Sequence, residues 1–352
     1  MTISNFTTSI SGGGSSNGSG CPPVDDSLEA LILLSVIIAL GLPGNVVALW
    51  ILCFKLKAWN PNNLFLFNLV IADFLVLMSL PLRIDDFLRS HWVFGDGLCR
   101  INIFLVFSSR SASIILMTVV AIYRYFKVVH PHHRFNRLTK RQAAYMLVFV
   151  WLLAISLSAP ILAYNHIKSS ANSTQCLFFT SSSFTNLVTM HRILTVLLFI
   201  IPLAMLLFCS IRISSFLRQR QMGKLEKVRK AMRVCNAIVA VFIVCFLPTT
   251  VTTIGLWVIH SYHSLDCTIR YTFIRLTIVS GWLNLLNSAL DPILYIFSSS
   301  MFKKALCSSL PRFLRYGQVT GDAEKTASST ESQSTTQQEL KSMRADRGSE
   351  AM

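Results

Sequence analysis

One arginine of this chain lies deep inside a long apolar segment, where a charge is costly to bury. Arg110, in Phe107-Ser-Ser-Arg110-Ser-Ala-Ser113, stands about three helical turns beyond Cys99. A buried guanidinium needs an anion or a dense set of acceptors, and its planar fork fits a carboxylate. Because the apolar run 99–127 contains no Asp or Glu, we favour capture of a ligand carboxylate by Arg110 over an internal ion pair.

A second arginine, Arg83, lies near the end of the preceding apolar segment, in Leu80-Pro-Leu-Arg83. It could face the same cavity as Arg110 and bind the same anion. It could equally extend outward to the membrane surface or pair with Asp85 or Asp86, which follow it directly. The sequence leaves these roles open.

Two carboxylates also lie within apolar segments. Asp73 and Asp291, with Asn45, Ser113 and Asn287, predict a polar cluster inside the membrane. Oxygen ligands suit a hard monovalent cation such as sodium, and no zinc-binding spacing is present. The alternative is a hydrogen-bonded packing network without an ion. We expect no other cofactor and, in the absence of a nucleophile–base pair or a phosphate-binding glycine loop, no enzyme.

The composition predicts helices on which these polar residues lie. The chain has 352 residues, of which 53% are hydrophobic and only 14% charged, whereas soluble domains are about a quarter charged. The net charge of +16 could suggest nucleic acid, but apolar runs of about 20 residues exclude that class. We predict an all-α membrane protein whose seven helices span approximately 28–54, 63–88, 99–127, 142–164, 187–216, 229–260 and 269–298.

The distribution of basic residues orients the bundle. Lys and Arg gather in the first, third and fifth connections and after the last span, whereas residues 1–27 contain none. The positive-inside rule therefore predicts an extracellular N-terminal tail (1–27) before the bundle (28–299). The sequons at Asn5, Asn17 and Asn172 all fall on the predicted outer face, where glycosylation occurs.

The outer face also carries four cysteines, in an oxidising compartment: Cys21, Cys99, Cys176 and Cys267. Of their three possible pairings we favour Cys99–Cys176 with Cys21–Cys267. On the inner side, residues 300–316 predict a short amphipathic helix and a basic stretch, in which Cys307 is either palmitoylated or an unmodified thiol. Residues 317–352 are polar and Ser/Thr-rich, which predicts a disordered cytoplasmic tail.

Taken together, the motifs closely resemble those of class A (rhodopsin-like) G-protein-coupled receptors over 28–310. The resemblance rests on Gly44-Asn45, Leu69…Ala72-Asp73, Trp92…Cys99, Tyr123-Arg124-Tyr125, Trp151, Pro202, Cys245-Phe-Leu-Pro248 and Asp291-Pro-Ile-Leu-Tyr295. It implies a seven-helix bundle with an eighth helix near 300–310, in the plasma membrane. It further implies a heterotrimeric G protein as partner, and a C-tail that is either phosphorylated for a receptor kinase and arrestin or simply solvated.

The subgroup resembled is that of the hydroxycarboxylic acid and oxoeicosanoid receptors. Two segments resemble the hydroxycarboxylic acid receptors: Arg124-Tyr-Phe-Lys-Val-Val-His-Pro-His-His133 and Leu217–Met222. Four segments resemble the oxoeicosanoid receptors: Leu80–Asp85, Arg110–Ser113, Ala231–Val234 and Ser264–Cys267. In this group the arginine matching Arg110 is the carboxylate anchor. The hydroxycarboxylic receptors add an arginine and a tyrosine where this chain has Thr253 and Leu285, which favours a longer, oxidised fatty acid over short acids such as lactate or 3-hydroxybutyrate.

The resemblance implies a mechanism and a set of residues for it. The ligand's carboxylate binds Arg110, and also Arg83 if that residue faces the cavity, while its tail packs on apolar neighbours. Span six then moves around its proline and exposes Arg124 to an inhibitory (Gi-type) G protein. The ligand-binding residues are Arg110, Arg83, Leu82, Phe107, Phe246 and Thr253; the switch and coupling residues are Tyr123, Arg124, Tyr125, Pro248, Asp291, Pro292 and Tyr295; and the ion site comprises Asp73, Ser113, Asn287 and Asp291.

One departure from the family pattern bears on signalling. The acid that normally precedes the motif's arginine is Tyr123 here, and a phenol forms no ion pair at pH 7. We hypothesise raised basal signalling; the alternative is that other cytoplasmic contacts compensate. Two rival functions stay open, a carboxylate carrier and a non-signalling scavenging receptor.

Overall fold

The computed structural model describes residues 27–55, 59–163, 166–170, 173–177, 186–219, 225–261 and 267–298. Seven long helices run through this part of the chain, each long and apolar enough to cross a membrane. They are α1 (Ser27–Trp50, continued by a π-helix at Ile51–Lys55), α2 (Pro61–Arg89), α3 (Gly95–Val129), α4 (Lys140–Ser158, continued by a 3-10 turn at Ala159–Ala163), α5 (Asn186–Gln219), α6 (Leu225–Ser261) and α7 (Cys267–Ser298).

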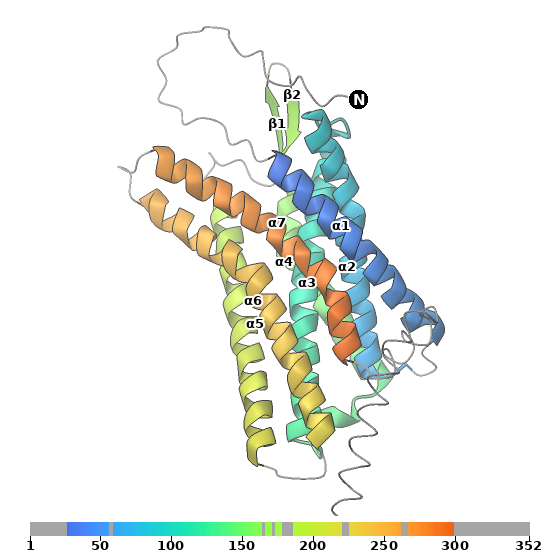
Figure 1. The fold of residues 1–352 in the computed structure, drawn as a ribbon. Coiled ribbons are helices and arrows are strands. Elements are labelled where there is room, and N and C mark those ends of the chain that lie inside the picture. Colours follow the sequence, from blue (N-terminus) through green and yellow to red (C-terminus); the bar gives the residue numbers. More distant parts are fainter. Residues whose placement is uncertain are drawn as a thin grey trace, which may run out of the picture.

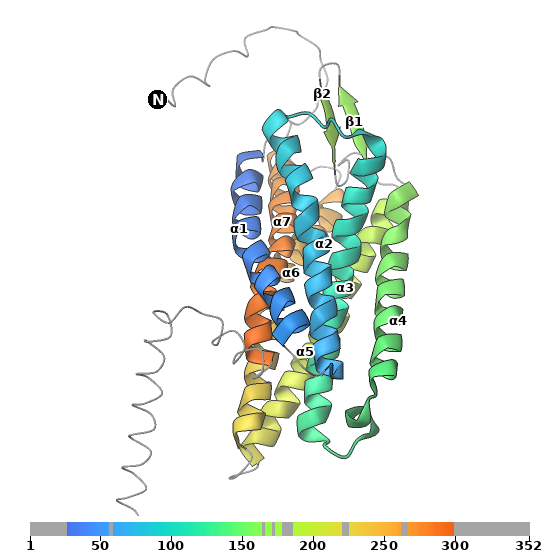
Figure 2. The same ribbon diagram turned by 90° about the vertical axis from the view of Figure 1, so that its right-hand side faces the viewer.

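The helices form one bundle, with α3 running through its middle (Figures 1 and 2). This confirms the predicted seven-transmembrane fold. A short 3-10 helix, Arg134–Arg137, lies between α3 and α4. The predicted eighth helix, N-terminal tail and C-terminal tail fall outside the described residues.

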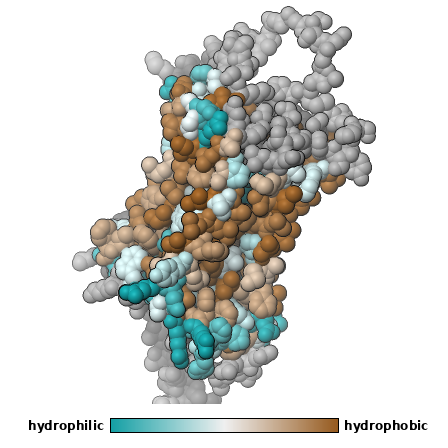
Figure 3. Space-filling view, turned by 180° about the vertical axis from the view of Figure 1, so that it is seen from behind, coloured by the Kyte–Doolittle hydropathy of each residue, from teal (hydrophilic) through white to brown (hydrophobic). Residues whose placement is uncertain are grey.

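The outer surface of the bundle is apolar, as expected for a protein embedded in a membrane. Large apolar side chains such as Phe149, Leu152 and Ile201 are 66%, 62% and 59% exposed, which in water would be unfavourable. Figure 3 shows the apolar residues as a broad belt, with hydrophilic residues gathered toward the ends. Lipid tails therefore cover this belt, and the backbone polar groups are satisfied within the helices.

Local signals in the sequence fix where helices begin. Asn60 precedes α2, and its side chain accepts a hydrogen bond of 2.9 Å from the backbone N–H of Asn63, with Pro61 in the first turn. Thr139 and Gln142 form a reciprocal capping box at the start of α4. These caps satisfy N–H groups that would otherwise have no partner at the helix ends.

A β-hairpin between α4 and α5 was not predictable from the apolar pattern of the sequence. Strand β1 (Ile167–Ser170) pairs antiparallel with β2 (Ser173–Cys176), with Ile167 opposite Cys176. The hairpin lies at the same end of the bundle as the loop between α2 and α3 (Figure 2). A disulfide joins Cys176 to Cys99 on α3, as predicted, so the base of the hairpin is fixed at the outer end of the central helix.

Candidate functional site

Arg110 lies on α3 between its two ends, with a partly exposed side chain. Its guanidinium stands 5.4 Å from the ring centre of Phe246 on α6, which is a cation–π contact. Within the part of the chain that the structure describes, Arg110 makes no ion pair, since the four pairs found there involve Arg83, Arg89, Arg100 and Arg275. A cation inside the membrane with an aromatic face beside it is suited to an anionic partner.

His191 on α5 is a site residue that sequence reasoning missed. Its ring meets the ring of Phe107 edge-on at a centroid distance of 4.6 Å, and it lies within electrostatic range of Arg110. Phe107 precedes Arg110 by about one helical turn on the same face of α3. No sequence spacing could have indicated this, because it depends on how α5 is positioned against α3.

The apolar residues predicted to line the site occupy neighbouring positions. Leu82 and Phe107 pack together with Cys99 and Cys176 in one cluster at the outer end. Phe246 is 1% exposed, and Thr253 is buried about two turns further out on α6. The structure thus brings Arg110 and Phe246 into direct contact, with Phe107 one helical turn from Arg110 on α3 and with Leu82 and Thr253 nearer the outer surface.

Arg83 is in a different environment from Arg110. It is 2% exposed, and one guanidinium nitrogen donates a hydrogen bond to the backbone carbonyl of Cys176 in the hairpin. It pairs with the Asp86 carboxylate at 3.5 Å and lies 5.9 Å from the Trp92 ring centre. Of the three roles that the sequence left open, the structure therefore shows pairing with a neighbouring acid.

The predicted polar cluster forms below Arg110. Asn287 donates to the Ser113 hydroxyl at 3.0 Å and to the Asp291 carboxylate at 3.1 Å. Tyr295 donates to Asp73 at 2.7 Å. Asp73 and Asp291 are fully buried and interact with one another. One oxygen of each accepts no hydrogen bond from the residues described, so the cluster has acceptors to offer to a cation or a proton.

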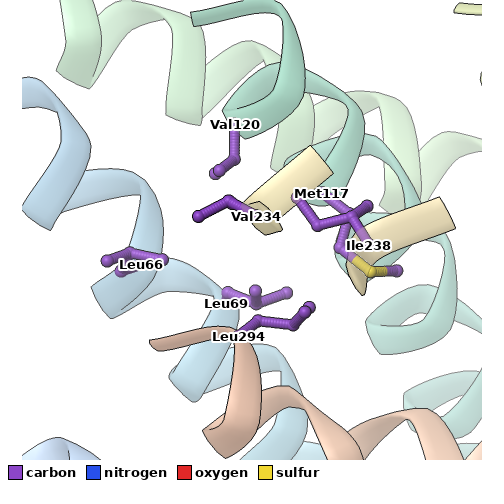
Figure 4. A pocket seen from close by; sticks show the side chains of 7 residues that line it. All are labelled: Leu66, Leu69, Met117, Val120, Val234, Ile238 and Leu294. Atoms are coloured by element: carbon purple, nitrogen blue, oxygen red, sulfur yellow. The ribbon is translucent and has the colours of Figure 1, made fainter. Parts of the chain in front are cut away.

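An apolar layer separates this cluster from the cytoplasmic ends of the helices. Its residues come from α2, α3, α6 and α7 and surround a cavity of about 10 Å³ (Figure 4): Leu66, Leu69, Met117, Val120, Val234, Ile238 and Leu294. A cavity of this size is at the lower limit for one water molecule, and its lining offers no polar partner to hold one. These seven side chains therefore form a dry apolar contact between α2, α3, α6 and α7.

At the cytoplasmic end of α3, Tyr123 is packed among aromatic rings. It is 5% exposed and meets Phe65 of α2 at 5.9 Å and Phe135 of the following loop at 6.2 Å. Lys127 lies 5.4 Å from its ring centre. Arg124, the next residue, lies within electrostatic range of Cys235 on α6. Tyr123 thus contacts the loop through ring packing, where an acid would act through charge.

Tyr125 faces the other side of α3. Its hydroxyl lies 3.0 Å from His130 Nε2, and its ring contacts Phe208 of α5. Pro248 and Pro292 lie inside α6 and α7, as the switch hypothesis requires. The predictions for Asn5, Asn17, Asn172, Cys21 and Cys307 fall outside the described residues, so the sequons, the Cys21–Cys267 pairing and palmitoylation stay predictions.

Comparison with known families agrees with this geometry. The profile of the family "7 transmembrane receptor (rhodopsin family)" matches residues 44–295. The chain therefore belongs to the rhodopsin family of G-protein-coupled receptors, and it is a receptor rather than an enzyme. Like the receptors it resembles, it is a multi-pass plasma-membrane protein with an extracellular N-terminus.

The relatives place it within one subgroup. Hydroxycarboxylic acid receptor 2 of Homo sapiens is 36% identical over 292 residues, 82% of this chain and 79% of that protein. Hydroxycarboxylic acid receptor 1 of Homo sapiens is 37% identical, over 84% of this chain and 86% of its own length. Oxoeicosanoid receptor 1 of Homo sapiens is 36% identical, over 82% and 75%. The predicted hydroxycarboxylic acid and oxoeicosanoid group is thereby confirmed.

Proposed function

We propose that this receptor detects an oxidised fatty acid of the 5-oxo-eicosanoid type and lowers cAMP through a Gi-type G protein. The main support for a carboxylate ligand is the environment of Arg110. This cation lies within the bundle, pairs with no acid among the described residues and faces the ring of Phe246. A carboxylate fits its fork, and displacement of water from such a site strengthens the pair.

The length of the ligand follows from what surrounds the arginine. Leu82 of α2 and Phe107 of α3 are partly exposed and offer an apolar surface that a hydrocarbon tail would cover, and the buried ring of Phe246 on α6 lies beside Arg110. Thr253 and Leu285 supply no second charge or phenol for a short acid, and Leu285 is buried in an apolar cluster with Trp282 and Val106. The name of oxoeicosanoid receptor 1 supports the same ligand class.

The mechanism is a shift of population between two states. A ligand that binds Arg110 of α3 and Phe246 of α6 more tightly in the active state favours that state. Phe246 precedes Pro248 by two residues, so a displaced ring acts close to the point where α6 lacks a regular helical bond. The cytoplasmic part of α6, with Cys235 near Arg124, then moves away and exposes Arg124 to the G protein.

We further propose that the cluster of Asp73, Ser113, Asn287 and Asp291 holds a sodium ion in the resting state. Two interacting carboxylates inside a membrane need a compensating cation or a shared proton. Two carboxylate oxygens that accept no hydrogen bond from the described residues support a cation. Receptor kinase and arrestin acting on the C-tail belong to the same proposal.

A second candidate is a receptor for short hydroxycarboxylic acids, which the names of hydroxycarboxylic acid receptors 1 and 2 favour. The deciding experiment measures inhibition of cAMP in cells that express the chain. The agonists are 5-oxo-eicosatetraenoic acid, lactate and 3-hydroxybutyrate, each with and without pertussis toxin. A toxin-sensitive response to the lipid alone supports the proposal, and a response to the small acids alone replaces it with the second candidate.

A further inference from the structure

The β-hairpin is fastened to α2 and to the loop that follows it. The backbone N–H of Trp92 donates to the carbonyl of Thr174 at 2.6 Å, and the N–H of Thr174 donates to His91 Nδ1 at 2.9 Å. Arg83 donates to the carbonyl of Cys176. Strand β2 is thus held along the α2 side at successive points, and Arg83 supplies the innermost of them.

The surroundings of Arg83 explain why its charge is tolerated there. The side chain is 2% exposed and pairs with Asp86, which is 9% exposed. A charged donor forms a stronger hydrogen bond to a carbonyl than a neutral donor does, and the nearby carboxylate offsets the cost of burial. Arg83 and Asp86 together therefore make a strong attachment point for the Cys176 carbonyl.

This attachment point lies at the outer end of the candidate site, close to the residues around Arg110. Cys176 packs in the same cluster as Leu82 and Phe107, and Phe107 lies one turn outward from Arg110. His166, just before β1, lies within electrostatic range of His191, which contacts Phe107. The base of the hairpin therefore lies on the outer side of Arg110, next to the residues that surround it.

We propose that Arg83 is a positioning residue: it ties the base of the hairpin to α2 and thereby sets how fast a ligand enters and leaves the site. Its part in ligand binding is indirect, because its side chain is 2% exposed and the nitrogen that donates to the Cys176 carbonyl is the one that pairs with Asp86. The disulfide fixes the same residue to α3, so Arg83 and Cys99 hold Cys176 from two neighbouring helices. The statement about ligand entry rests on the proposed function; the statement about the hairpin does not.

The first test needs no ligand. Hydrogen–deuterium exchange of backbone amides in 166–170 and 173–177 is measured on the full chain in lipid nanodiscs. Arg83→Met should raise exchange there by about tenfold or more, because it removes the tie to α2. Arg89→Met is the matched control: Arg89 is on the same helix and pairs with Asp85 at 2.8 Å, but its side chain is 60% exposed, so exchange in the hairpin should not change.

A double variant distinguishes two causes of faster exchange: loss of the hydrogen bond from Arg83 to Cys176, and a buried Asp86 carboxylate left without its partner. Arg83→Met with Asp86→Asn leaves no unpaired carboxylate, and it should loosen the hairpin as the single variant does. Restored protection in the double variant would overturn the proposal, since the effect would then come from Asp86 alone. Unchanged exchange in both variants would overturn it too.

The second test compares 5-oxo-eicosatetraenoic acid with its methyl ester, which carries no charge. Arg83→Met should speed association and dissociation of the acid together and keep the preference for acid over ester. Loss of that preference, as expected for Arg110→Met, would make Arg83 a carboxylate ligand and overturn the proposal. If Arg110→Met leaves acid binding intact, the proposed function fails, and the exchange measurement still decides the role of Arg83.

Discussion

The side-chain amide of Asn45 on α1 donates a hydrogen bond of 2.8 Å to the backbone carbonyl of Ser288 on α7. In a regular helix this carbonyl would accept from the residue four positions later, but that residue is Pro292, which has no N–H. Asn45 therefore replaces the missing helical bond. Its second N–H goes to the carbonyl of Gly41 at 3.0 Å, so α1 and α7 are joined where α7 is interrupted.

Replacing Asn45 with Ala should leave the Ser288 carbonyl without this donor in a fully buried place. We expect the free energy of unfolding to fall by about 1–3 kcal/mol, seen as a lower apparent melting temperature in detergent. Ser156→Ala is the control, because the Ser156 hydroxyl is exposed and donates to the Leu153 carbonyl of its own helix. Equal melting temperatures for the two variants would contradict the role given to Asn45.

Gly44 permits the close contact between the same two helices. A Cβ at residue 44 would lie 2.8 Å from Cγ of Pro292, whereas a Cβ at Gly281 of α7 would meet no described residue within 4 Å. Gly44→Ala should therefore push α1 from α7 and destabilise the receptor by about 1–3 kcal/mol. Gly281→Ala should be neutral or stabilising by up to about 1 kcal/mol, because Ala favours helix. Thermal unfolding of the two variants checks this; a more stable Gly44→Ala variant would refute the contact.

With Tyr123 in place of an acid, the receptor should signal more strongly without ligand than a variant with a carboxylate at this position, because that carboxylate would hold Arg124 in the resting state. Tyr123→Asp restores the acid and should lower basal activity, measured as cAMP inhibition without ligand at equal surface expression. Tyr123→Phe keeps the ring contacts with Phe65 and Phe135 and should behave as the parent. Unchanged basal activity in Tyr123→Asp would mean that ring packing alone holds the resting state.

The region around Arg83 shows what the sequence could and could not predict. The sequence places both Asp85 and Asp86 next to Arg83. In the structure Arg83 pairs with Asp86 at i,i+3 and Arg89 pairs with Asp85 at i,i+4, the two spacings at which side chains on a helix face each other. The carbonyl of Cys176 as a partner of Arg83 was not predictable, because it depends on a hairpin 93 residues away.

The same distinction holds for the whole receptor. Apolar length predicted the seven spans, since each helix must cross the membrane by itself. Composition could not predict the contact of His191 with Phe107, because that contact depends on the rotation of α5 about its axis. The motif cysteines predicted the disulfide at Cys99 and Cys176, which the structure confirms.

The most direct test of the account is the affinity of the purified receptor for 5-oxo-eicosatetraenoic acid, compared among the parent, Arg110→Ala and Arg110→Lys. If Arg110 holds the carboxylate, Arg110→Ala should weaken binding by about 100-fold or more, given the energy of a desolvated charge pair. The affinity of Arg110→Lys should lie between those of the parent and Arg110→Ala, because lysine keeps the positive charge but lacks the planar guanidinium that binds both carboxylate oxygens. Equal affinity of parent and Arg110→Ala, with both correctly folded, would contradict the central claim.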